Sequence, residues 1–297
     1  MKTSDTRIWT ALVTPMDQSG KVDTDGLLSL IARQQEAGNG VLLLGSTGEG
    51  LALGLEEKKS VIEAANRFGP NVPVMAGVGG FNLEEQKRWI EWAGGKVDAF
   101  LLVAPLYAKP GPEGMKLWFR ELLDASERPC MIYNIPSRSG VKIPPEVVQS
   151  LEGHSRLWAL KESSGNLEEY VAFRGASPDL YIYSGDDKMM PQFARAGCQG
   201  LVSVASNVWP EAVGRYEEGC QQGKISENDE PWARAVELLF SAPNPIPAKA
   251  LLAEKGWIDH AAVRLPLTQE ESFSRKDLAE ADRKIEEWFE NLENQGE

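Results

Sequence analysis

Eight short runs of β-forming residues alternate with amphipathic segments along most of this sequence, and the alternation constrains the fold more than any other feature. The runs cover residues 8–14, 40–46, 72–79, 99–105, 130–136, 157–163, 180–186 and 200–206. The intervening segments, such as DGLLSLIARQQEAG, carry apolar residues at spacings of three and four and end near a glycine, as helices do. Near-continuous apolar strands separated by helices predict a parallel sheet, and eight such units predict a (β/α)8 TIM barrel.

The pattern changes near the end of the chain. Beyond about residue 222 the segments have helical spacing only, as in EPWARAVELLFSA and PIPAKALLAEKG. No low-complexity or Gly/Ser-rich linker separates these segments from the barrel. We therefore expect a catalytic barrel in residues 1–222 and a C-terminal helical region in residues 223–297 that packs on it.

Charge and composition narrow the kind of partner. A formal net charge of −13 at pH 7 disfavours binding to nucleic acid and to anionic membrane surfaces. No apolar stretch approaches the roughly 20 residues that span a bilayer, and the first residues lack a signal core, so we expect a cytoplasmic protein. The three cysteines have no CxxC spacing and the two histidines are not paired, which predicts neither a disulfide framework nor a metal site.

One lysine stands where a barrel enzyme carries out its chemistry. Lys161 ends the apolar run LWALK, and barrel enzymes place reactive groups where strands end. Side-chain alternation puts Lys161 on the inner face with Leu157 and Ala159. Trp158 and Leu160 then face the surrounding helices. Burial disfavours the charged form of an amine, so a lysine here can act as a Schiff-base nucleophile on a ketone. The alternative is a lysine that reaches solvent from the strand end.

Polar residues after neighbouring strands can complete a site around Lys161. Tyr133 lies near the end of the preceding run, so its phenol can meet the lysine across adjacent strands and pass protons, although an aromatic residue there can equally belong to the core. Arg138, after YNIP, suits bidentate capture of a carboxylate, or it is a surface cation. The loop GSTGEG lacks the spacing of nucleotide-binding glycine loops and instead offers backbone N–H groups and two hydroxyls to a small anion.

The motifs GSTGE, YNIPSRSG, LKESSGN, SGDD and NPIPAK together resemble the family of pyruvate-dependent class I lyases that includes dihydrodipicolinate synthase and N-acetylneuraminate lyase. The resemblance runs from TALVTPM to RLPL, nearly the whole chain. Within the family the synthase branch fits best, because its YN-[VI]-P-x-R-[TS]-G form appears here with Arg138, an arginine that the sialic acid lyases usually lack. The segment NPIPAK, residues 244–249, also resembles the synthases.

The resemblance implies that pyruvate forms an imine with Lys161 and that the reaction uses neither a cofactor nor a metal. Ser46 and Thr47 would hold the pyruvate carboxylate, and Val202 would line the pocket. Ser46 stands where threonine is common in the family, which keeps the hydroxyl but loses the methyl group that restricts its rotamer.

The resemblance also implies the second half of the reaction. Tyr133, linked to Ser46 and Tyr107, would relay protons, and Arg138 would hold the carboxylate of aspartate semialdehyde. Cyclisation would then release 4-hydroxy-tetrahydrodipicolinate. In the family the tyrosine at position 107 enters a neighbouring subunit's site, so an active homo-oligomer, a dimer or a tetramer, is expected.

Two other functions remain open. A paralogous aldolase or lyase acting on a sugar acid or another 2-oxo acid would carry the same lysine, because aldehyde specificity rests on few loop residues. A non-enzymatic barrel that senses a small acid is a second alternative, and the joint retention of Lys161, Tyr133 and Tyr107 argues against it.

Feedback inhibition by free lysine is expected to be weak or absent. In inhibited relatives, histidine, asparagine, glutamate and tyrosine side chains hold the ligand's charged groups. The matching positions here are Leu55 and Lys58 for the histidines, Phe81 for the asparagine and Leu106 for the tyrosine, and only Glu85 persists.

Overall fold

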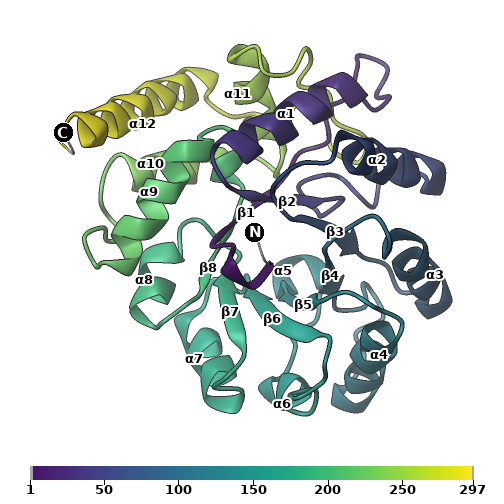
Figure 1. The fold of residues 1–297 in the computed structure, drawn as a ribbon. Coiled ribbons are helices and arrows are strands. Elements are labelled where there is room, and N and C mark those ends of the chain that lie inside the picture. Colours follow the sequence, from purple (N-terminus) through teal and green to yellow (C-terminus); the bar gives the residue numbers. More distant parts are fainter. Residues whose placement is uncertain (1–2, 296–297) are drawn as a thin grey trace.

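The computed structural model describes residues 3–295 and confirms the predicted barrel. Its strands form one closed parallel sheet in the order β1 to β8 (Figure 1). Each strand ends one to three residues before the β-forming run that predicted it, because the run continues into the loop at the carboxyl end of the strand. The strands are β1 (Ile8–Ala11), β2 (Gly40–Leu43), β3 (Val74–Val78), β4 (Ala99–Val103), β5 (Cys130–Asn134), β6 (Leu157–Glu162), β7 (Tyr181–Ser184) and β8 (Gly200–Ser203).

Helices surround the barrel (Figure 1). The first shows why these segments are helical: the Asp23 side chain caps its start by accepting from the Gly26 amide, and Leu27, Leu30 and Ile31 form its buried face. The helices are α1 (Thr24–Glu36), α2 (Leu55–Phe68), α3 (Leu83–Ala93), α4 (Pro112–Asp124), α5 (Pro136–Ser139), α6 (Pro145–Gln149), α7 (Leu167–Ala176), α8 (Met190–Arg195), α9 (Pro210–Gln221), α10 (Trp232–Leu239), α11 (Ile246–Glu254) and α12 (Arg275–Gln295); two short 3-10 segments are η1 (Thr3–Asp5) and η2 (Ala205–Asn207).

The buried apolar residues form two clusters, one inside the barrel and one between the barrel and its helices. Ala159 belongs to the inner cluster and Leu160 to the outer one, as side-chain alternation along β6 predicts. The next residue, Lys161, is therefore directed back toward the interior. Alternation near the end of a barrel strand is what brings this charged side chain to the mouth of the barrel.

The predicted orientation of the first residues of β6 was wrong. Leu157 packs against the outer cluster, and Trp158 packs against the inner one, with its ring 5.9 Å from that of Trp9. The cause is an irregularity in the pairing with β5, where Cys130 pairs with Leu157 but the next residue pairs with Ala159. Trp158 is the extra residue of a β-bulge. The bulge reverses which side of the sheet Leu157 and Trp158 face, relative to simple alternation, and leaves the orientation of the later residues as predicted.

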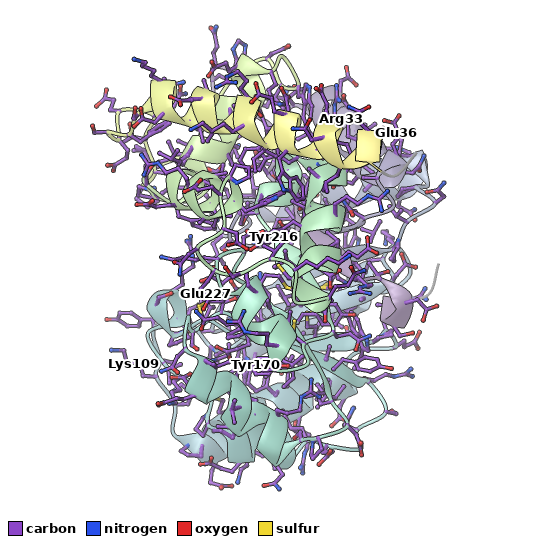
Figure 2. The ribbon with its side chains drawn as sticks, turned by 90° about the vertical axis from the view of Figure 1, so that its left-hand side faces the viewer. Arg33, Glu36, Lys109, Tyr170, Tyr216 and Glu227 are labelled. Atoms are coloured by element: carbon purple, nitrogen blue, oxygen red, sulfur yellow. The ribbon has the colours of Figure 1, made fainter. Side chains whose placement is uncertain are left out.

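The helices α10 and α12 contact α9 and the residue that precedes it. Trp232 of α10 stacks on Tyr216 of α9, with ring centroids 4.3 Å apart, and meets the edge of Trp288 of α12. Trp209 also donates from its indole N–H to Asp282 of α12 at 2.7 Å. Figure 2 shows α12 lying across one end of the molecule, beyond Tyr216. The division of the chain into two domains at residue 222 stays a prediction.

The described residues lack two features that define other classes of protein. Among residues 3–295, no helix combines the length and the apolar character needed to cross a bilayer. The same residues contain no cluster of His, Cys, Asp and Glu side chains suited to hold a metal ion.

Candidate active site

Lys161 and Tyr133 meet at the carboxyl end of the barrel. They are register partners on the adjacent strands β6 and β5, and Lys161 Nζ lies 4.2 Å from the centroid of the Tyr133 ring. Both are buried, with 4% of Lys161 and 6% of Tyr133 exposed. The amine therefore lies over the face of the phenol ring, and this arrangement brings a proton donor close to the nitrogen.

The loop after β2 carries Ser46 and Thr47. Its glycines are required by close contacts: a Cβ on Gly50 would lie 2.1 Å from the carbonyl oxygen of Leu44. Within the described part of the chain, the amides of residues 46–48 donate no backbone hydrogen bond, so three N–H groups remain for a ligand. The loop sequence predicts that these donors and the two hydroxyls bind a small anion, and that role stays a prediction.

The same loop is held from the C-terminal region. Asn244 donates to the hydroxyl of Thr47 at 2.9 Å, which leaves the Thr47 proton free to donate to a ligand. Two residues further on, the buried carboxylate of Glu49 accepts from Lys249 of α11 at 2.5 Å and from the Arg264 amide at 2.9 Å. Sequence reasoning missed this anchoring; its only signal was the NPIPAK motif, noted there for its resemblance alone.

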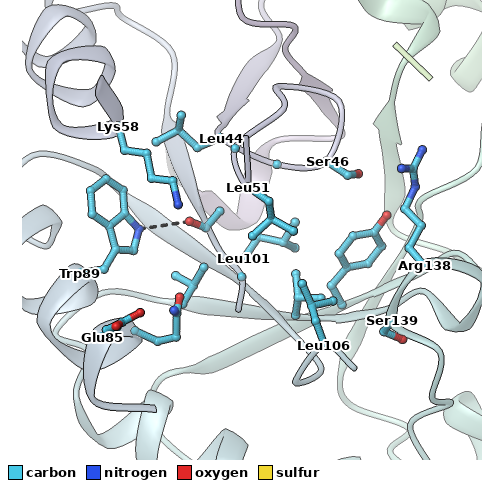
Figure 3. Close-up of a pocket in the computed structure, with 18 of the residues that line it drawn as sticks. Leu44, Ser46, Leu51, Lys58, Glu85, Trp89, Leu101, Leu106, Arg138 and Ser139 are labelled. Atoms are coloured by element: carbon cyan, nitrogen blue, oxygen red, sulfur yellow. Dashed lines mark hydrogen bonds between the residues drawn. The ribbon is translucent and has the colours of Figure 1, made fainter. Parts of the chain in front are cut away.

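A cavity of about 1260 Å³ opens beside these residues. Four of the predicted site residues line it, namely Ser46, Tyr107, Tyr133 and Arg138. Figure 3 shows Ser46 and Arg138 at one end of the cavity, with Lys58 and Glu85 at the other. Arg138 lies on the short helix α5, and no described carboxylate pairs with its guanidinium, so this group is available to an anion.

Three predicted residues lie outside the cavity lining. Lys161 is in contact with Tyr133, and Thr47 follows Ser46, so both adjoin the cavity. Val202 is 1% exposed and packs in the inner cluster with Tyr133. Its contact with a bound substrate stays a prediction.

Tyr107 differs from the others in its exposure. It is 90% exposed and has a positive φ of 68°, a backbone conformation that few residues other than glycine adopt. Its side chain extends from the loop after β4 into solvent. A strained residue that presents an aromatic ring to solvent is a candidate for function.

Two carboxylates near Lys161 were not singled out from the sequence, Glu162, which is buried, and Asp186, which is half-buried. Burial raises the pKa of Glu162, although Asn134 at 2.7 Å and the Ser164 amide at 2.6 Å donate to it. Burial also raises the pKa of Asp186, and the charge of Lys161 acts in the opposite direction. Asp186 thus adds negative potential near the lysine, while Glu162 joins the ends of β5 and β6.

A second buried acid ties β7 to β8. Burial raises the pKa of Asp187 to about 6. Its carboxylate accepts from the hydroxyl of Ser203 at 2.5 Å and from the amides of Val204 and Ala205 at 2.9 and 3.3 Å. These bonds fix the turn that follows β8 at the barrel mouth.

A parallel barrel with a buried lysine and a neighbouring tyrosine at its mouth is the arrangement expected of a pyruvate-dependent class I lyase. The chain belongs to the Dihydrodipicolinate synthetase family, whose sequence model matches residues 4–284. The family resemblance drawn from the motifs is confirmed.

Individual relatives agree over almost the whole chain. A 4-hydroxy-tetrahydrodipicolinate synthase of Francisella philomiragia is 44% identical over 288 residues, which cover 96% of this chain and 98% of the relative. The crystal structure of a dihydrodipicolinate synthase from Bacillus anthracis has a TM-score of 0.88 at 31% identity, covering 95% of this chain and 99% of that one. A synthase from Acinetobacter baumannii, described as complexed with pyruvate, has a TM-score of 0.87 at 30% identity, with coverage of 95% and 99%.

Proposed function

We propose that this protein is a lyase that condenses pyruvate with L-aspartate 4-semialdehyde to 4-hydroxy-tetrahydrodipicolinate, in lysine and diaminopimelate biosynthesis. The observation that carries the proposal is the contact between Lys161 and Tyr133 at the mouth of the barrel, in a chain whose relatives are named for this reaction. The imine itself withdraws the electrons that the reaction must move, so the proposal includes neither a metal nor an organic cofactor. The location in the cytoplasm stays a prediction.

The first half of the reaction would take place on Lys161. Its free amine attacks the ketone carbon of pyruvate, and loss of water leaves an iminium that acidifies the adjacent methyl group. Ser46 and Thr47 would hold the pyruvate carboxylate; the unused amides and hydroxyls of their loop support this role. Tyr133 would pass protons, which is supported by the contact between its ring and the amine.

The second half would form the carbon–carbon bond. The enamine attacks the aldehyde carbon of the semialdehyde, while Arg138 holds the carboxylate of this substrate. Arg138 lines the cavity and has no carboxylate partner among the described residues, which supports that role. The substrate's own amine then attacks the iminium carbon and displaces Lys161. This step closes the ring and regenerates the enzyme, and the water released during imine formation balances the reaction.

We further propose that the active form is a homo-oligomer in which Tyr107 enters the site of a second copy. Support comes from exposed apolar side chains: Leu51 and Leu55, which line the cavity, are 62% and 57% exposed, and Phe81, two residues after the lining residue Gly79, is 66% exposed. Such a concentration of apolar surface beside a cavity is typical of an interface. Tyr107 would complete the proton relay with Tyr133 and Ser46 across that interface.

Two inactive variants test the shared site. If Tyr107 acts in the partner's site, a mixed dimer of Lys161→Ala and Tyr107→Phe subunits contains one complete site, and mixing followed by subunit exchange should restore activity. If Tyr107 acts in its own subunit, neither site of the mixed dimer is complete and activity stays absent. The molar mass from light scattering, measured on the same samples, establishes whether an oligomer forms.

Borohydride trapping tests the proposed function itself. Reduction in the presence of pyruvate should inactivate the enzyme and add the mass of reduced pyruvate to a peptide that contains Lys161. A label on another lysine, or no label, would exclude the Schiff-base mechanism at this residue. Turnover of aspartate semialdehyde, compared with sugar-derived aldehydes, then separates the synthase from the paralogous aldolase that the sequence left open.

A further inference from the structure

A serine beside the reactive lysine has no assigned role. Ser163 follows β6 directly, and its amide donates to the carbonyl of Asn134 at 2.9 Å, which fixes its backbone at the joined ends of β5 and β6. It stands two residues after Lys161, so side-chain alternation directs both toward the barrel interior. Ser163 is 8% exposed, and its hydroxyl oxygen has no hydrogen-bond partner among residues 3–295.

Gly185 shows how close this hydroxyl lies to the lysine. A Cβ built on Gly185 would lie 1.9 Å from Ser163 Oγ and 2.5 Å from Lys161 Cε. The two atoms are therefore separated by no more than the sum of these distances. Because Nζ is bonded to Cε, an oxygen attached to the carbon that Nζ attacks can be placed within hydrogen-bonding reach of Ser163.

The Ser163 hydroxyl has no hydrogen-bond partner within residues 3–295 and is free to bind a ligand. Buried hydroxyl groups are paired in most native proteins, since leaving one unpaired forfeits the hydrogen bond it made with water. Ser163 Oγ shares the space beside the Gly185 Cα with Cγ and Cε of Lys161, and neither carbon forms a conventional hydrogen bond. Ser164 provides a contrast, because its hydroxyl is used locally and accepts from the Asn166 amide at 3.2 Å.

We propose that the Ser163 hydroxyl hydrogen-bonds the oxygen of the carbinolamine that pyruvate forms on Lys161. The inference rests on the proposed function, since it concerns an intermediate of that reaction. Nζ forms a bond to the ketone carbon, the carbonyl electron pair moves onto oxygen, and a proton passes from nitrogen to that oxygen. The C–O bond then breaks and the oxygen leaves as water with one more proton from the Tyr133 relay. Ser163 donates a hydrogen bond to the oxygen throughout and keeps its own proton.

The carbinolamine oxygen is the part of the adduct that fits this hydroxyl. The pyruvate carboxylate is assigned to the loop of Ser46 and Thr47 after β2, whereas Ser163 and Gly185 lie after β6 and β7, on the other side of the barrel mouth. The hydroxyl on the attacked carbon is the remaining oxygen of a pyruvate adduct. A donor that meets the charge developing on that oxygen stabilises the addition and dehydration steps.

The test compares Ser163→Ala with the matched control Ser164→Ala. The rate constant for imine formation is measured by rapid mixing with pyruvate, quenching with borohydride and intact-protein mass spectrometry. We expect Ser163→Ala to lower this rate constant at saturating pyruvate by about 10-fold to 100-fold. The pyruvate concentration that gives half the maximal rate should change little, and Ser164→Ala should react like the wild type.

The melting temperature separates this role from a structural one. Because Ser163 Oγ has no hydrogen-bond partner in the described part of the chain, its removal should leave the melting temperature unchanged or raise it slightly. Loss of a structural hydrogen bond would lower the melting temperature. If the alanine variant does not fold, Ser163→Gly lacks the same hydroxyl and should show the same slowing. A rate constant within twofold of wild type in either folded variant overturns the inference. Failure of the wild type itself to be labelled at Lys161 overturns the proposed function instead.

Discussion

The buried ion pair between Lys249 and Glu49 gives a quantitative prediction, because it joins the C-terminal region to the loop that carries Ser46 and Thr47. Lys249 is 0% exposed, and its ammonium donates to Glu49 at 2.5 Å and to the carbonyl of Ala262 at 2.7 Å. Burial lowers the pKa of Lys249, and the charge of Glu49 opposes that effect. Each charge is tolerated in the interior because the other is present.

Lys249→Met keeps most of the side-chain length but removes the charge. It leaves the carboxylate of Glu49 buried with one remaining hydrogen bond, from the Arg264 amide, and leaves the Ala262 carbonyl without its donor. Removing one partner of a buried pair costs about 3–5 kcal/mol. For a chain of this size, that corresponds to a melting temperature lower by roughly 6–15 °C.

A compensating variant tests the reason for this loss. In the double variant Glu49→Gln with Lys249→Met, neither charge of the buried pair remains, and the amide oxygen can still accept from the Arg264 amide. We expect the double variant to regain at least half of the unfolding free energy that Lys249→Met loses. If the two substitutions acted independently, their losses would add, and the double variant would be less stable than the single one.

The assays are urea unfolding, which gives the free energy of unfolding, and the dependence of rate on pyruvate concentration. Because Glu49 lies two residues after Thr47, the single variant should also raise the KM for pyruvate more than it changes kcat. The reasoning is refuted if Lys249→Met costs less than about 1 kcal/mol, or if the double variant is no more stable than the single one.

Four further predictions concern the site and its surroundings. Arg138→Leu should lower turnover of aspartate semialdehyde by about 100-fold and leave pyruvate trapping intact; near-normal turnover would remove this arginine from the site. Gly185→Ala should fold but form the imine at least about 100-fold more slowly, because the added methyl displaces Lys161; normal trapping would contradict the close contact. The pKa of Asp187 is about 6 in the folded protein and near 3.9 in the unfolded chain. The stability of the wild type relative to Asp187→Asn should therefore be greatest below about pH 4 and should fall as the pH rises through 6. Urea unfolding of both proteins from pH 4 to 8 checks this, and a pH-independent difference would refute it. Millimolar lysine should not slow the enzyme at subsaturating pyruvate; inhibition relieved by Glu85→Ala would show that a lysine site survives.

The sequence by itself determined the architecture and most of the candidate site. Apolar runs alternating with amphipathic segments are sufficient for a parallel barrel, since each pattern reflects local burial. In a parallel barrel, a polar residue at the carboxyl end of a β-forming run lies at the mouth of the barrel. For this reason Lys161 and Tyr133 could be paired before any coordinates, and their pairing in register followed from the order of the strands.

The tertiary structure alone decided what depends on exact register or on distant segments. The bulge in β6 reversed the face of Trp158, because one extra residue shifts the alternation and leaves no signal in the composition of the run. Asn244 reaches Thr47 across 197 residues and Lys249 reaches Glu49 across 200. Local patterns cannot anticipate such bonds, since they form only when the closed barrel brings the first loops and the last helices to the same end. The unpaired hydroxyl of Ser163 is likewise visible only when all its neighbours are in place.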